Sequence, residues 1–170
     1  EPEVAAAAAR GLAAAGEGGA VETLLRELPE RERGLRREVL AALATRRSDV
    51  AGEVRRELGA AEGARRAWAL EVLGAVGGRA DAGELLAGLD CGDRDVRAAA
   101  AAALRRLAAR HPGPQPWFPE LRDRWRRTSD PRLLVALAEC LATTGETAAP
   151  EAILERLASV PESLRERLVE

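Results

Sequence analysis

The stretch from Leu85 to Ala109 reads LLAGLDCGDRDVRAAAAAALRRLAA, and it decides the fold. With Ala82 just before it, Leu85, Leu86 and Leu89 follow the i, i+3, i+4, i+7 spacing of one helical face. A short Asp-rich run comes next, and a segment of Ala and Leu that is apolar nearly all round follows it. The stretch therefore predicts two helices joined by a turn, the first half-exposed and the second packed between neighbours.

The same pair of patterns recurs along the chain. A late leucine marks each Ala/Leu-rich segment, and the successive spacings are 31, 30, 31 and 37 residues for Leu12, Leu43, Leu73, Leu104 and Leu141. Segments with a single apolar stripe alternate with them, at 20–28, 49–58, 80–89, 117–127 and 148–159. Such a period indicates stacked helical hairpins, because each hairpin leaves an apolar face that the next one covers. We therefore expect an all-α protein with a period of about 30 residues.

The period divides residues 1–170 into a single array. We expect an unpaired inner helix at 2–15, helical hairpins at 20–46, 49–77, 80–110 and 117–145, and a partial hairpin at 148–170. Both ends look like cut repeats without polar caps, so we expect the chain to be an excerpt of a longer protein. The start has no basic region followed by an apolar one, which favours a cytoplasmic protein without a secretory signal.

The composition agrees with a protein built from short helices. Aromatic residues make up only 2% of the chain, which argues against a β-sandwich. No apolar run is long enough to span a bilayer, so we expect no membrane insertion. All 26 basic residues are Arg, as is typical of a GC-rich genome, and 28 acidic residues balance them. This near balance argues against a nucleic-acid partner.

The turn before the Ala/Leu helix resembles that of a known family. Asp95-Val96-Arg97 enters this helix, and Asp130-Pro131-Arg132 is a weaker copy of the same signal. In these features the chain resembles HEAT repeats of the bacterial kind, also called phycobilisome-lyase HEAT-like repeats. The resemblance implies a right-handed α-solenoid whose usual work is binding other macromolecules. We therefore expect a protein-interaction scaffold with a protein partner and no catalytic activity of its own.

Arginines in matching register are interpreted as ties between repeats. Arg36 and Arg66 occupy the register of Arg97. In resembling repeats such a basic residue joins one turn to the next through carboxylates such as Asp95, and we favour this role over a basic ladder that faces a ligand. Each tie of this kind at the surface stabilises the fold by up to about 1 kcal/mol.

One candidate partner-binding surface is a column on the concave side of the predicted solenoid. By register it contains Arg10, Glu71 and Glu139, with Ala102 between the two glutamates. Mixed charge and a small residue suit a protein surface better than a phosphate backbone. Reversing both glutamates to Arg is therefore expected to weaken partner binding and to leave the melting temperature nearly unchanged.

A second candidate is the proline-rich insertion at 111–119, which accounts for the one long spacing. Its Trp117 and Phe118 have two interpretations. They bind a partner at one rim of the solenoid, as loops often do, or they fill a gap between repeats within a stiff connector. We favour the connector.

The sequence also offers a nucleic-acid alternative. The alkylpurine DNA glycosylases, which are built on HEAT-like repeats, line a groove with aromatic rings, basic residues and a catalytic carboxylate. Here Trp68 and Trp125 are expected in the core, and only Glu71 follows a Trp at a suitable helical spacing. Six adjacent Arg pairs would attract phosphates, but nearby acidic residues neutralise much of this charge. We therefore place this function second.

Residues that carry other chemistry are few. The chain has one histidine, His111, and its two cysteines, Cys91 and Cys140, lie far apart in sequence. They form neither a metal-ligand spacing nor a nucleophile–base pair, so we expect no catalytic residue, no metal and no cofactor. Both thiols are expected to be free, with Cys140 the slower to react.

Overall fold

The computed structural model describes residues 19–27 and 33–144, together with the separate positions 7, 11, 150, 151, 153 and 154. Within these residues the chain forms eight α-helices and no strand, so the expected all-α class is confirmed. None of the described helices is long and apolar enough to cross a bilayer. Arg10 lies outside the described residues, as do most of the helix expected at 2–15 and of the partial hairpin expected at 148–170.

The helices occupy the segments that the hydrophobic pattern predicts. The segments with one apolar stripe are helices α2 (Ala20–Glu27), α4 (Arg47–Leu58), α6 (Ala82–Leu89) and α8 (Phe118–Arg127). The Ala/Leu-rich segments are helices α3 (Arg33–Leu43), α5 (Gly63–Val76), α7 (Arg94–Arg110) and α9 (Pro131–Thr143). Short 3-10 turns precede α4 and α6, at η1 (Ala44–Arg46) and η2 (Arg79–Asp81).

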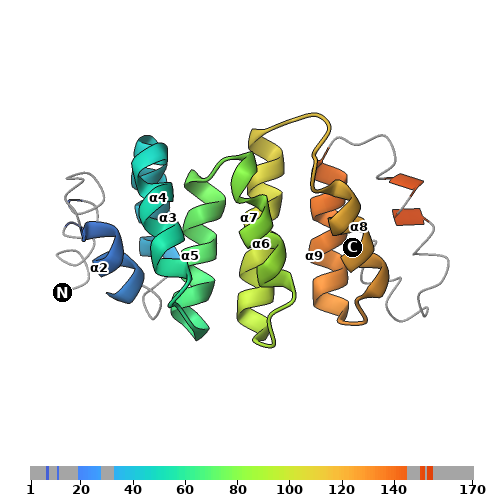
Figure 1. Ribbon diagram of the computed structural model, residues 1–170, viewed down its shortest axis with the longest axis horizontal. Helices are drawn as coiled ribbons and strands as arrows, with labels where there is room; N and C mark the ends of the chain where they lie inside the picture. The colour runs from blue at the N-terminus through green and yellow to red at the C-terminus, as the bar shows by residue number, and fades with distance from the viewer. Residues whose placement is uncertain are drawn as a thin grey trace.

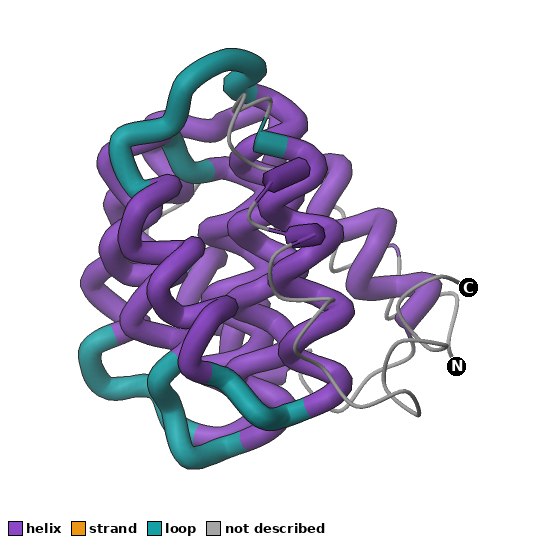
Figure 2. The backbone as a smooth tube through the Cα atoms, turned by 90° about the vertical axis from the view of Figure 1, so that its right-hand side faces the viewer, coloured by secondary structure: helices purple, strands orange, loops and turns teal. Residues whose placement is uncertain are grey.

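Contacts between helices follow a regular pattern. The odd-numbered helices α3, α5, α7 and α9 each contact the next of this series, and α5 against α7 is the most extensive contact in the described chain. The even-numbered helices α4, α6 and α8 pack against α5, α7 and α9. The helices lie side by side in chain order along the long axis (Figure 1), with connecting loops at their two ends (Figure 2). Within the described residues, α5 and α7 are thus packed between neighbours on both sides, as expected.

The core consists mainly of Leu, Val and Ala from these two sets of helices, with two tryptophans at its largest positions. Trp68 on α5 and Trp125 on α8 are fully buried, which confirms their expected place in the core. Each indole N–H donates to a backbone carbonyl, that of Trp68 to Leu24 at 3.2 Å and that of Trp125 to Leu134 at 3.3 Å. The polar atom of each ring is therefore satisfied without water.

Glycine and alanine let neighbouring helices approach closely. A Cβ atom at Gly74 of α5 would lie 2.4 Å from the Cβ of Ala103 on α7. A Cβ atom at Gly88 of α6 would lie 2.8 Å from the Cβ of Ala100, also on α7. No side chain fits in either place, so glycine at these two positions allows the short distance between the packed helices.

The proline-rich insertion folds back onto the core. Trp117 is 4% exposed and Phe118 is 6% exposed, and both belong to the buried apolar cluster. Within the loop the Gln115 side chain donates to the carbonyl of Gly113 at 2.8 Å, where the backbone has φ +101°. The structure thus favours the connector over a rim that binds a partner. The expectation of Trp117 and Phe118 as partner contacts is corrected, because packing against the core removes both rings from the surface.

Candidate interaction surface

Two adjoining grooves lie on the exposed side of the odd-numbered helices. The larger has a volume of about 850 Å³ between α3, α5 and α7, and the smaller has about 220 Å³ between α7 and α9. Both are lined by Asp95, Ala98 and Ala102, which follow each other along one side of α7. We call the two grooves together the alanine face, because their other small lining residues are Ala64, Ala67, Ala99, Ala101 and Ala136.

The structure brings the described members of the predicted column onto this one surface. Glu71 lines the larger groove, Glu139 lines the smaller, and Ala102 lines both. Register along the chain therefore predicted the placement of these three residues relative to one another. It gave no indication of what the two glutamates contact.

Both glutamates already have arginine partners within the chain. Arg36 on α3 forms an ion pair with Glu71, and Arg105 on α7 forms one with Glu139. The first pair is half-buried, at 20% and 23% side-chain exposure, and the Arg36 guanidinium also lies 4.9 Å from the centre of the Trp68 ring. Both carboxylates are therefore paired within the chain, and their expected contact with a partner stays a prediction.

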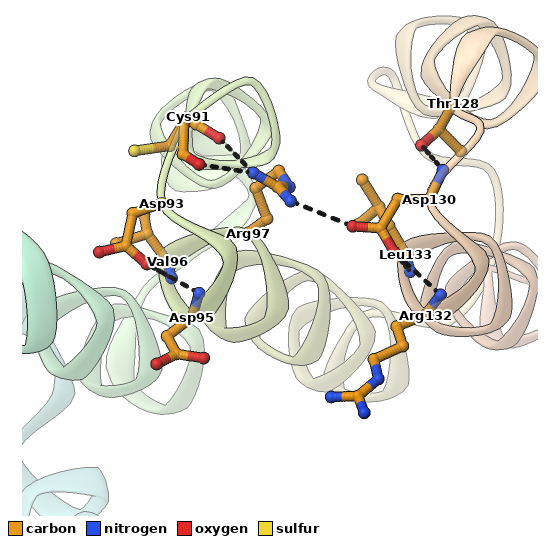
Figure 3. A network of polar contacts seen from close by, with 10 residues as sticks. Cys91, Asp93, Asp95, Val96, Arg97, Thr128, Asp130, Arg132 and Leu133 are labelled. Atoms are coloured by element: carbon orange, nitrogen blue, oxygen red, sulfur yellow. Dashed lines mark hydrogen bonds and ion pairs between the residues drawn. The ribbon is translucent and has the colours of Figure 1, made fainter.

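Arg97 joins two consecutive turns, as the sequence predicts for this register. Its guanidinium donates to the carbonyls of Cys91 and Gly92 at 2.9 Å each and to the carboxylate of Asp130 at 3.0 Å (Figure 3). The carboxylate partner is Asp130, the N-cap of α9, which is the acidic residue of the next turn along the chain. The Asp95 side chain points away from Arg97 because it lies on the groove side of α7.

Asp130 has two roles at the start of α9. One carboxylate oxygen accepts the backbone N–H groups of Arg132 at 3.0 Å and Leu133 at 3.4 Å, which caps the helix. The other oxygen accepts the hydrogen bond from Arg97, and this bond lowers the pKa of Asp130 below its usual value. Asp93 caps α7 in the same way, through the N–H groups of Asp95 and Val96.

Arg66 has no such tie within the part of the chain that the structure describes. It makes no side-chain hydrogen bond or ion pair with any described residue, and its Nε is buried without a partner. Arg36 and Arg97, by contrast, each have a carboxylate within reach, that of Glu71 on α5 and that of Asp130 at the N-cap of α9.

Further arginine ties were missed by sequence reasoning. Arg124 on α8 forms an ion pair with Asp90 at 2.8 Å, and Arg55 on α4 forms one at 2.5 Å with the buried carboxylate of Asp81, which raises the pKa of Arg55. Arg110 at the end of α7 donates to the carbonyl of Gly77 at 2.7 Å, just past the end of α5. An Arg and an Asp or Glu separated by about one period are the sequence signal that would have found several of these ties.

All three tryptophans and Phe118 are buried, so no Trp or Phe ring faces solvent in this part of the chain. Cys91 and Cys140 are free thiols, as expected, and burial raises the pKa of Cys140 to about 12. Neither groove of the alanine face is lined by a His, Ser or Cys.

The chain matches no known protein-family model and no curated protein sequence.

Proposed function

We propose that the chain is a HEAT-like, right-handed α-solenoid that serves as a protein-interaction scaffold without catalytic activity. Two features support the solenoid: each odd-numbered helix contacts the next, and ion pairs join residues 33 to 35 positions apart. Such ties between neighbouring units are expected where each unit is stabilised mainly by the next one.

The observation that carries the proposed function is the alanine face. It extends over four helices as open grooves with a floor of short apolar side chains and a border of charged ones. A partner backbone can approach such a floor closely, and the charges at the border fix its register. The lining residues of both grooves are Arg, Asp, Glu, Ala and Leu, which offer a partner both charged and apolar contacts.

Site-specific photo-crosslinking in the cells that make the protein tests this function. A photoreactive amino acid in place of Ala102 is expected to capture a protein, because this residue lies where the two grooves meet. The control carries the same amino acid in place of Glu84, which is exposed on α6 and lines neither groove. Equal capture at both positions, or no protein captured at position 102, contradicts the proposal. A nucleic-acid adduct at position 102 supports the nucleic-acid alternative instead.

A further inference from the structure

We infer that the alanine face binds an acidic segment of its protein partner, whose carboxylates reach the arginines at the border of the grooves and whose small apolar residues lie on the alanine floor. This inference rests on the proposed function and names the chemistry of the partner.

Many charges of the alanine face are already paired within the chain. Three ion pairs lie there, and each joins two odd-numbered helices or their first turns: Arg36 with Glu71, Arg97 with Asp130, and Arg105 with Glu139. These pairs hold the scaffold together. Their carboxylates are neutralised inside the chain, so they neither attract a basic partner nor repel an acidic one strongly.

Four arginines of the alanine face remain without such a partner. Arg37 and Arg106 line the larger groove, and Arg94 and Arg132 line the smaller. All four are exposed, and none forms an ion pair or a side-chain hydrogen bond with a described residue, although the charge of Arg94 helps to lower the pKa of Asp130. In Figure 3 the Arg132 side chain points away from the network around Arg97, on the same side as Asp95.

Two carboxylates of the alanine face are also outside these ion pairs, but both lie at the start of α7. Asp93 is its N-cap and accepts two backbone N–H groups, and Asp95 lies in its first turn. The positive end of the helix dipole offsets part of their charge. The arginines outside these ion pairs therefore outnumber the carboxylates outside them, and the alanine face is complementary to an acidic ligand.

The alanine side chains on the floor of the grooves place a second requirement on the partner segment. Ala64 and Ala98 are exposed, and Ala102 and Ala136 are half-exposed. Their side chains are apolar and too short to fill the grooves. An occupant with small apolar residues between its acidic ones buries this floor and keeps its carboxylates within reach of the border.

A protein fits this pattern better than a nucleic acid. Asp95 lies on the ridge that both grooves share, where it would face the phosphates of a strand laid across them. No Trp or Phe ring of the described surface is available for stacking against bases. A polypeptide, by contrast, can place a neutral or basic residue opposite Asp95 and acidic residues on either side of it.

The test is a binding measurement by fluorescence anisotropy. The probe is a fluorescein-labelled peptide of Glu, Ala and Leu, compared with the same peptide carrying Gln for every Glu and with a single-stranded oligonucleotide of equal charge. The test variant is Arg106→Glu with Arg132→Glu, one arginine from each groove. The matched control is Arg56→Glu with Arg79→Glu, two exposed arginines outside both grooves with the same change in net charge.

The wild-type chain is expected to prefer the Glu peptide to the Gln peptide, with an affinity that falls as salt is added. The test variant should bind the Glu peptide at least about tenfold more weakly, and the control variant should bind it within about twofold of wild type. Both variants should keep the wild-type melting temperature, because none of the four arginines forms an ion pair or a side-chain hydrogen bond with a described residue.

Three results overturn the inference: no preference for the Glu peptide, equal loss of binding in both variants, or tighter binding of the oligonucleotide than of the peptide. If position 102 captures a protein but the Glu peptide is not preferred, the proposed scaffold function is retained and the inference of an acidic partner segment is wrong. If no protein is captured there, the proposed function itself fails.

Discussion

Replacing Gly74 with Ala tests the packing that holds the odd-numbered helices together. Gly74 is buried in the last half of α5, where that helix meets α7. The added Cβ would lie 2.4 Å from the Cβ, 2.5 Å from the Cα and 3.1 Å from the carbonyl oxygen of Ala103. Two of these atoms are backbone, so a side-chain rotation cannot relieve the overlap and α5 must move away from α7.

The size of the effect follows from two opposing contributions. Overpacking a core costs about 1–3 kcal/mol, and more where backbone has to shift. Alanine recovers about 0.8–1 kcal/mol because it forms helix better than glycine. We therefore expect Gly74→Ala to lower the free energy of unfolding by about 2 kcal/mol, which is about 4–8 °C in melting temperature for a chain of this length.

The matched control is Gly52→Ala in α4, where a new Cβ would have no atom within 4 Å of it. This substitution should raise the free energy of unfolding by about 0.5–1 kcal/mol through helix propensity alone. Urea unfolding followed by far-UV circular dichroism measures both variants against wild type. A Gly74→Ala protein as stable as wild type would refute the close approach of α5 and α7.

The remaining predictions concern charge and thiol chemistry. Asp130→Asn keeps the helix cap but loses the ion pair with Arg97, so it should cost up to about 1 kcal/mol at neutral pH, whereas Asp130→Ala should cost about 1 kcal/mol more. Because Arg97 lowers the pKa of Asp130 in the folded state, the pair stabilises the fold above the unfolded pKa of about 4 and loses this effect as pH falls through the folded pKa. Urea unfolding across this pH range should therefore show that Asp130→Asn is less stable than wild type at neutral pH and equally stable in acid. A difference in stability that persists in acid would argue against the pair. A thiol reagent should label Cys91 in the native protein and reach the fully buried Cys140 only as fast as the protein opens, so equal labelling rates would contradict the packing of α9. Glu71→Arg places a second guanidinium beside the half-buried guanidinium of Arg36, so it should lower the free energy of unfolding by more than about 1 kcal/mol. Register alone predicts an unchanged melting temperature instead, and thermal unfolding decides between these two outcomes.

The sequence predicts the helices well because their signal is local. The i, i+3, i+4 spacing of Leu85, Leu86 and Leu89 depends only on which face of one helix is buried, and α6 ends at Leu89 as this spacing implies. The burial of Trp68 follows in the same way from its place in an apolar helix.

Side-chain partners were harder to predict because they depend on how far apart the packed helices lie. Register places Glu71 and Glu139 on the same surface, but it does not say that Arg36 and Arg105 of the preceding odd-numbered helix reach them. The position of Trp117 was left between two interpretations, since a proline-rich segment has no periodicity from which burial can be read.

The most direct test of the central claim is the affinity of the Ala102→Trp variant for the protein captured at that position by crosslinking. Ala102 is half-exposed where the two grooves meet, so an indole there fills the alanine face without entering the core. Isothermal titration calorimetry should show at least about tenfold weaker binding, or about 1.4 kcal/mol, at an unchanged melting temperature, while Glu84→Trp on α6 should bind like wild type. Wild-type affinity in Ala102→Trp would contradict the claim that the alanine face is the interaction surface.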